Sequence, residues 1–128
     1  MVLCIAAGIV SCRTADKKGG TAGGTTTIEW LDSTTQNLGQ VKDGQTVEVT
    51  YRFKNSGDND LIIENVQPGC GCTVADKPQH PIAPGKEDVI RAKFDSRGRP
   101  GPNSKYLTVT ANTADKQTTL RFSVEVVE

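Results

Sequence analysis

From residue 27 onward, apolar and polar residues alternate along the chain with a period of two. The clearest case is Thr46–Lys54, in which Val47, Val49, Tyr51 and Phe53 share one face. This alternation predicts a β-strand with one buried face, because successive side chains of a strand point to opposite sides. The same period recurs in segments 90–95, 107–112 and 120–126, and less regularly in 27–31, 61–66 and 38–41.

Turn-forming residues separate these segments. Glycine, proline, asparagine and aspartate, which supply the backbone angles of chain reversals, gather at 42–44, 55–60, 84–86 and 99–102. No segment carries the apolar repeat of a helix. About seven short strands in roughly 100 residues predict an all-β fold, an immunoglobulin-like antiparallel β-sandwich. A small open β-barrel is the alternative.

Length and charge narrow the classes of function. The 128 residues are enough for one folded domain, and 15 basic residues balance 15 acidic ones. A nucleic-acid partner is not expected, because such binding normally needs a basic face. The few aromatic residues are scattered and form no platform for stacking bases or sugars.

The amino terminus has the features of a sorting signal. Residues 2–10 form an apolar run that leads into Ser11-Cys12. As a helix this run would span ~14 Å of a ~30 Å hydrocarbon core, so it has the length of a signal-peptide core and not of a membrane span. An apolar leader that packs as an edge strand is the alternative.

The run and its cysteine resemble the lipobox of bacterial lipoproteins. The resemblance implies that residues 1–11 are a signal-peptide remnant and that Cys12 is lipidated. No lysine or arginine precedes the run, which departs from the usual pattern. Arg13 gives no aspartate retention signal, so the resemblance points to the outer membrane, facing the periplasm.

Residues 12–26 are expected to be the lipidated cysteine and a flexible linker that precedes a folded domain at 27–128. The linker is rich in glycine and threonine, which bury little apolar area. A flexible chain of this length has a mean reach of ~20 Å. The linker therefore predicts a tether that holds the domain near a membrane surface in the cell envelope.

The segment Pro68–Thr73 contains Cys70, Gly71 and Cys72 and is the main candidate for a chemically active site. In an extended strand the two cysteine Cα atoms would lie ~6.6 Å apart, at the upper edge of disulfide geometry. Gly71 allows a tighter turn that brings the sulfurs closer. The favoured interpretation is structural, with thiols buried against the sheet or linked locally to shape the loop.

Two other interpretations of this pair stay open. Paired thiolates select soft ions, so Cys70 and Cys72 could bind Cu(I), with His80 as a third ligand from a proline-rich loop. This alternative resembles envelope copper carriers built on immunoglobulin-like frames with a Cys-x-Cys pair. The second alternative is that the two cysteines form a redox couple, although the two-residue spacer of a Cys-x-x-Cys motif and the helix of that motif are both absent.

A longer pattern accompanies the cysteines. It consists of Cys-Gly-Cys-Thr at 70–73, Ile-Ala-Pro-Gly-Lys at 82–86, Phe-Asp-Ser-Arg-Gly at 94–98, Lys105 and the stretch 109–112. Over roughly residues 32–128 the chain is similar to the bacterial family known only as domain of unknown function 1573. The resemblance implies an immunoglobulin-like β-sandwich related to major-sperm-protein and cilia-associated domains. It also implies envelope proteins, many of them lipoproteins, and no established activity.

The remaining candidate residues favour binding over catalysis. His80 is the single histidine, and no serine lies in a Gly-x-Ser-x-Gly elbow, so we expect no enzyme. Arg97, Arg99 and Lys105 flank a turn and are candidates for binding a partner's carboxylates or phosphates, with a solvated turn as the alternative.

These observations predict a lipid-anchored cell-envelope protein that acts as a non-catalytic binding or scaffolding module. Its expected partner is an envelope protein or peptide, and no cofactor is expected. A copper-binding, metallochaperone-like protein that uses the Cys-Gly-Cys pair is the alternative.

Overall fold

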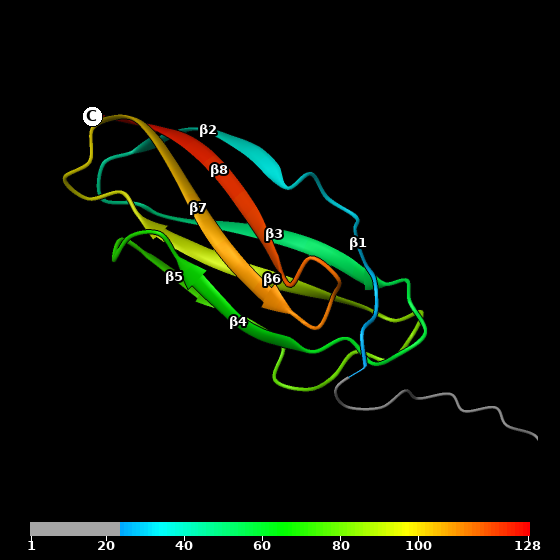
Figure 1. Ribbon diagram of the computed structural model, residues 1–128. Coiled ribbons are helices and arrows are strands. Elements are labelled where there is room, and N and C mark those ends of the chain that lie inside the picture. Colours follow the sequence, from blue (N-terminus) through cyan, green and yellow to red (C-terminus); the bar gives the residue numbers. More distant parts are fainter. Residues whose placement is uncertain (1–23) are drawn as a thin grey trace, which may run out of the picture.

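The computed structural model describes residues 24–128 and shows two four-stranded β-sheets packed face to face (Figure 1). One sheet has the order β1-β3-β6-β5, from Ile28–Trp30, Thr46–Asn55, Glu87–Asp95 and Thr73–Asp76. The other has the order β2-β8-β7-β4, from Thr35–Lys42, Gln117–Val127, Gly101–Ala111 and Ile63–Pro68. The predicted all-β sandwich is confirmed, and neither sheet closes into a barrel.

The core lies between the two layers and comes from the alternating positions that the sequence indicated. On β3, Val49, Tyr51 and Phe53 are buried, while the intervening Glu48 and Arg52 are exposed. Among the described residues, most of the buried hydrophobic side chains are aliphatic, and four are aromatic. The fully buried large ones are Tyr51, Phe53, Leu61, Ile90, Phe94, Leu107, Leu120 and Phe122.

The strands differ most from the prediction at two places. β5, Thr73–Asp76, directly follows the cysteine loop and was not predicted as a strand. β7 begins at Gly101, inside a segment predicted to be a turn. Along β7, Leu107 is the first residue that pairs with β4, and Pro102 lies five positions before it. The missing N–H of Pro102 therefore removes no hydrogen bond to β4.

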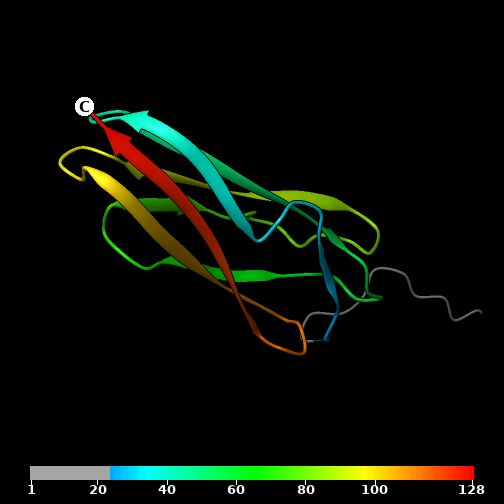
Figure 2. The same cartoon turned by 90° about the horizontal axis from the view of Figure 1, so that it is seen from above.

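The chain crosses from one sheet to the other between β1 and β2. Asp32 marks this crossing, where its carboxylate accepts bonds from the backbone N–H of Arg52 and from the guanidinium of the same residue at 2.8 Å. These bonds hold the pKa of Asp32 below its usual value. β2 then pairs in parallel with β8, while the other pairs of adjacent strands are antiparallel; Figure 2 shows β2 beside β8.

One buried hydroxyl links the two layers through the core. Tyr51 on β3 donates a hydrogen bond of 2.7 Å to the carbonyl oxygen of Arg121 on β8. The Tyr51 side chain is fully buried, and this burial raises its pKa to about 12. The bond satisfies a phenol that would otherwise be costly to bury.

The end of the sandwich where the domain begins is called the proximal end here. Asn112 donates a hydrogen bond to the carbonyl oxygen of Gly24, and Thr26 donates one of 2.8 Å to the side chain of Asn55. Thr26 was expected in the linker, yet it is buried, because its hydroxyl satisfies the fully buried Asn55. The contacts of the domain thus begin before residue 27.

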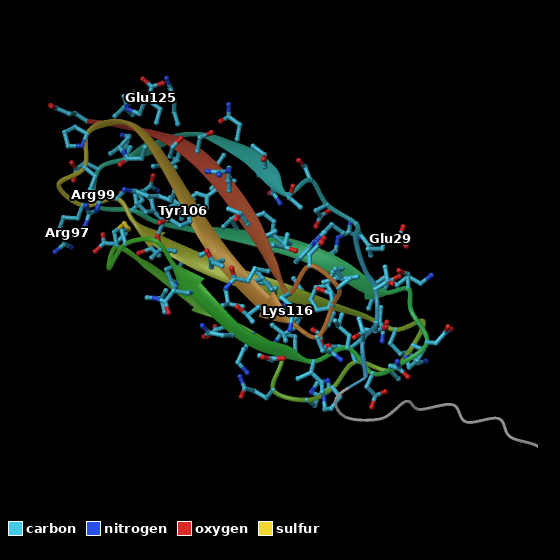
Figure 3. All side chains as sticks on the ribbon, in the orientation of Figure 1. Glu29, Arg97, Arg99, Tyr106, Lys116 and Glu125 are labelled. Carbon is cyan, nitrogen blue, oxygen red and sulfur yellow. A yellow bond between two sulfur atoms is a disulfide. The ribbon has the colours of Figure 1, made fainter. Side chains whose placement is uncertain are left out.

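The opposite, distal end holds the cysteine loop 69–72 and the turn 96–100. The N–H of Asp95 donates to the carbonyl oxygen of Cys72, and the N–H of Gly98 donates to the carboxylate of Asp43. The N–H of Asp43 in turn donates to the carbonyl oxygen of Val127, so the last strand ends here too. In Figure 3, Arg97 and Arg99 lie at this end, opposite Glu29 and Lys116.

Candidate functional site

The cysteine loop is held in place by the junction of β4 and β7. After β4 ends at Pro68, the N–H of Gly69 donates a 2.9 Å bond to the carbonyl oxygen of Tyr106 on β7. The ring of Tyr106 packs directly on Gly69, where a Cβ atom would come within 2.5 Å of it. Only glycine fits this position, so the ring sets where the loop leaves the sheet.

Cys70 and Cys72 form a disulfide in the structure, with Cα atoms 5.3 Å apart. This separation is shorter than that of an extended strand, as expected if Gly71 allows a tighter turn. Cys70 is half-buried, whereas Cys72 is only 6% exposed. The two cysteine residues therefore differ in their exposure to solvent.

Polar groups of the loop surround both sulfurs. The N–H of Cys72 donates to the Sγ of Cys70 at 3.2 Å. The hydroxyl of Thr73, a residue that is only 5% exposed, lies 3.8 Å from the Sγ of Cys70 and 3.7 Å from that of Cys72. A groove of about 490 Å³, lined by Gln67, Pro68, Gly69, Cys70, Gly71 and Thr73, runs along the outside of the loop.

The disulfide shapes the loop but links no two strands. It joins cysteines only two positions apart, and both flank the same turn. On the chain-entropy relation such a short loop contributes about 1.6 kcal/mol, against about 3 kcal/mol for a loop of 15 residues. Its contribution to the stability of the whole sandwich is therefore small.

His80 lies at the proximal end, away from the cysteines. Its Nε2 is 3.7 Å from the carboxylate of Asp88, and its side chain is 71% exposed. Asp88 and Asp95, which bonds to Cys72, lie seven positions apart on β6, which corresponds to about 23 Å. The structure does not bring Cys70, Cys72 and His80 together.

Among residues 24–128, no group of three or more histidine, cysteine, aspartate or glutamate side chains is placed to hold a metal ion. In the disulfide form, the two cysteine sulfurs are bonded to each other and present no thiolate. The residues described here thus offer no complete ligand set for a soft metal.

The three candidate basic residues lie in different surroundings. Arg97 and Arg99 are exposed in the distal turn, and neither forms an ion pair within residues 24–128. Lys105 instead points inward from β7, with its Nζ 5.9 Å from the centre of the Phe94 ring. The structure therefore groups the two arginines and places the lysine between the sheets, close to the cysteine loop.

Cys12, the predicted lipidation site, lies outside the described residues. Within residues 24–128 there is no helix with the length and hydrophobicity to span a membrane.

Sequence reasoning missed the edge strand β5 and its exposed Val74. The Val74 side chain is 65% exposed on an outer strand, while its neighbours Thr73 and Ala75 point toward the core. The alternation of Thr73–Asp76 was the available signal, although four residues are too few for a period to stand out.

Comparison with known proteins places this geometry in a family. The model of the family described as "Protein of unknown function (DUF1573)" matches residues 28–126. No curated protein matches the chain. A protein of unknown function from Porphyromonas gingivalis W83 has a similar structure, with a TM-score of 0.69 and 20% identity over 82% of this chain. That match covers 49% of the Porphyromonas chain, so this chain spans about half its length.

Two further solved structures share the fold alone. A PapD-like domain of human CEP192 has a TM-score of 0.61 at 13% identity, with 93% of this chain and 97% of that one covered. The VesB protease of Vibrio cholerae has a TM-score of 0.60 at 14% identity, over 79% of this chain and 32% of that one. Identities this low bear on the architecture and not on activity.

Proposed function

The chain belongs to the DUF1573 family of proteins of unknown function, and we propose that it is a lipid-anchored binding or scaffolding module of the bacterial cell envelope. Cys12 would be the anchor, in the outer membrane and facing the periplasm. The partner would be an envelope protein or peptide that presents an extended segment to the edge strand β5. No catalysis or cofactor is part of this proposal.

The edge of β5 is the observation that carries this proposal. The N–H of Asp95 on β6 donates to the carbonyl oxygen of Cys72. In an antiparallel pair every second residue turns its N–H and C=O toward the partner strand, so the backbone groups of Val74 also face β6. The N–H and C=O of Ala75 therefore face the outer edge, where no described residue bonds to them. An extended polypeptide can add a strand at such an edge through main-chain hydrogen bonds.

The two edges of the opposite sheet are less suited to pairing. β2 and β4 each carry an irregularity in register, between Asn37 and Gln40 and between Ile63 and Asn65. Bulges of this kind protect edges against strand addition. β5 pairs with β6 in unbroken register and presents Val74 outward, which would pack against an alternate side chain of the added strand.

A photo-crosslinking amino acid at position 74 tests this edge in living cells. We expect adducts from position 74 and none from position 40, an exposed site on β2. Ala75→Pro should abolish the adducts, because it removes an outward N–H and leaves the bonds to β6 in place. Equal adducts from both positions, or adducts that persist in a folded Ala75→Pro variant, would contradict the proposal.

The copper alternative has a separate test. We expect the reduced chain to lose Cu(I) to a competing chelator, because the described residues supply two sulfurs and no third ligand nearby. One-to-one retention of Cu(I) that disappears in the Cys70→Ser plus Cys72→Ser variant would replace the binding-module proposal with the copper one.

A further inference from the structure

We propose that the Cys70–Cys72 disulfide is a thiol–disulfide exchange site that forms a reversible mixed disulfide with a cysteine thiol of an extended polypeptide. Access is the first support. Cys70 lines the groove beside the loop, and Gly71, at the tip, has open space in place of a side chain. Cys72 is almost completely buried. An incoming thiolate can therefore reach the sulfur of Cys70 and not that of Cys72.

Thr73 is the second support. It is a buried polar residue, and its hydroxyl has the two cysteine sulfurs as its only side-chain partners among residues 24–128. A hydroxyl at 3.7 Å from the Sγ of Cys72 can donate a hydrogen bond to a thiolate that forms there. Such a bond favours the charged form of a sulfur that burial alone would disfavour.

Lys105 supplies positive charge on the inner side of the same loop. In the register of β4 and β7, Pro68 lies opposite Leu107 and Gly69 bonds to Tyr106, so Cys70 follows at the level of Lys105. The ammonium of Lys105 rests over the ring of Phe94, which lies opposite Thr73 on β5. A cation near a thiol lowers the pKa of the thiol. In Cys-x-x-Cys proteins the amino terminus of a helix has the same effect.

The chemical step balances without any further reactant. The thiolate of the polypeptide attacks the Sγ of Cys70 and forms a new sulfur–sulfur bond. The bond between Cys70 and Cys72 breaks, and its electron pair leaves on the Sγ of Cys72, which is released as a thiolate next to the hydroxyl of Thr73. Attack by Cys72 on the mixed disulfide reverses the step and releases the polypeptide as a thiol. This activity goes beyond the proposed strand pairing, since it needs only the loop.

The experiment uses the full chain with Cys4 and Cys12 replaced by serine, so that one disulfide remains. The probe is a short synthetic peptide with a single cysteine, in excess over the oxidised chain. Acid stops the reaction, maleimide then caps free thiols in denaturant, and mass spectrometry locates both groups. We expect peptide on Cys70 and maleimide on Cys72, formed about tenfold faster than the same peptide exchanges with oxidised glutathione.

Peptide found equally on both cysteines, or exchange no faster than with oxidised glutathione, would overturn the proposal. This measurement needs no substitution in the loop, so it stands even if loop variants unfold. It is also separate from the edge test, because a chain with Ala75→Pro should still exchange.

Thr73→Val tests the role of the hydroxyl with almost no change in shape. We expect exchange to slow about three- to tenfold, since one hydrogen bond to the leaving sulfur is lost. Thr110→Val, on the half-buried outer side of β7, is the matched control and should keep the original rate. An unchanged rate in a folded Thr73→Val variant, or an equal loss in Thr110→Val, would remove Thr73 from the site.

Discussion

At the scale of single residues, a few buried polar groups fix how the two sheets face each other. Tyr51 reaches across the core to the carbonyl oxygen of Arg121, and Thr26 bonds to Asn55 at the proximal end. Each group is buried and has a partner, and among the described residues no buried side-chain nitrogen or oxygen lacks one. Replacing one member of such a pair leaves the other without a partner in an apolar setting.

The raised pKa of Tyr51 predicts a loss of stability in alkaline solution. The unfolded chain ionises this phenol near its ordinary value of 10, whereas the folded chain keeps the proton until about 12. The contribution of Tyr51 to the free energy of unfolding therefore keeps its full value below pH 10. As the pH rises toward 12 it falls by about 2 kcal/mol, because the unfolded chain loses the phenol proton first. Urea unfolding at a series of pH values measures the effect.

Tyr51→Phe is the control for this prediction. Its free energy of unfolding should fall less between the same pH values, because the variant lacks the buried phenol hydroxyl of Tyr51. Parallel curves for the two proteins would show that Tyr51 does not carry the dependence.

Alternation revealed which residues are buried but not which polar groups pair. Val49, Tyr51 and Phe53 were predicted to share a face, and all three are buried. The partner of the Tyr51 hydroxyl lies 70 positions away, and Thr26 lies 29 positions from Asn55. Periodicity describes one strand at a time, so a contact between sheets has no local signal.

At the scale of elements, the long strands were predictable and the short ones were not. β3, with its ten residues, shows nearly perfect alternation, and all but the last of them were predicted. β5 has only four residues, directly after the cysteine motif, and this length is too short to show an alternation. The candidate set Cys70, Cys72 and His80 was proposed because soft ions prefer such ligands, an argument that carries no information on the distance between them. β5 and the loop after it carry His80 to the other end of the molecule.

The small loop enclosed by the disulfide predicts that reduction changes the stability of the fold only slightly. The free energy of unfolding should fall by about 1.6 kcal/mol when the bond between Cys70 and Cys72 is reduced. Urea unfolding with and without a phosphine reductant measures the difference. The Cys70→Ser plus Cys72→Ser variant should not respond to the reductant, and a loss above about 4 kcal/mol would mean that the bond supports the core.

At the scale of the whole molecule, the cysteine loop and the start of the domain lie at opposite ends. Along β7, the level of the cysteine loop at Lys105 and the end of the strand at Ala111 are six residues apart, which corresponds to about 20 Å. If Cys12 is the anchor, the cysteine loop and the two arginines would face away from the membrane.

Lipidation of Cys12 predicts a labelled, membrane-bound protein. In a Gram-negative host fed an alkyne fatty acid, the chain should carry the label and sediment with membranes, because acyl chains give stable anchoring. Cys12→Ser should remove the label and release the chain to the soluble fraction, while Cys4→Ser should change neither. A label that persists in Cys12→Ser would place the modification elsewhere.

The parallel pairing of β2 with β8 has a mechanical consequence. The described chain enters at the proximal end and leaves, after β8, at the distal end, so tension between its two ends runs along the strands (Figure 1). That tension would slide β2 and β8 past each other and load the hydrogen bonds from Thr35 to Lys42 together instead of one by one. A domain pulled in this geometry resists extension until these hydrogen bonds shear together.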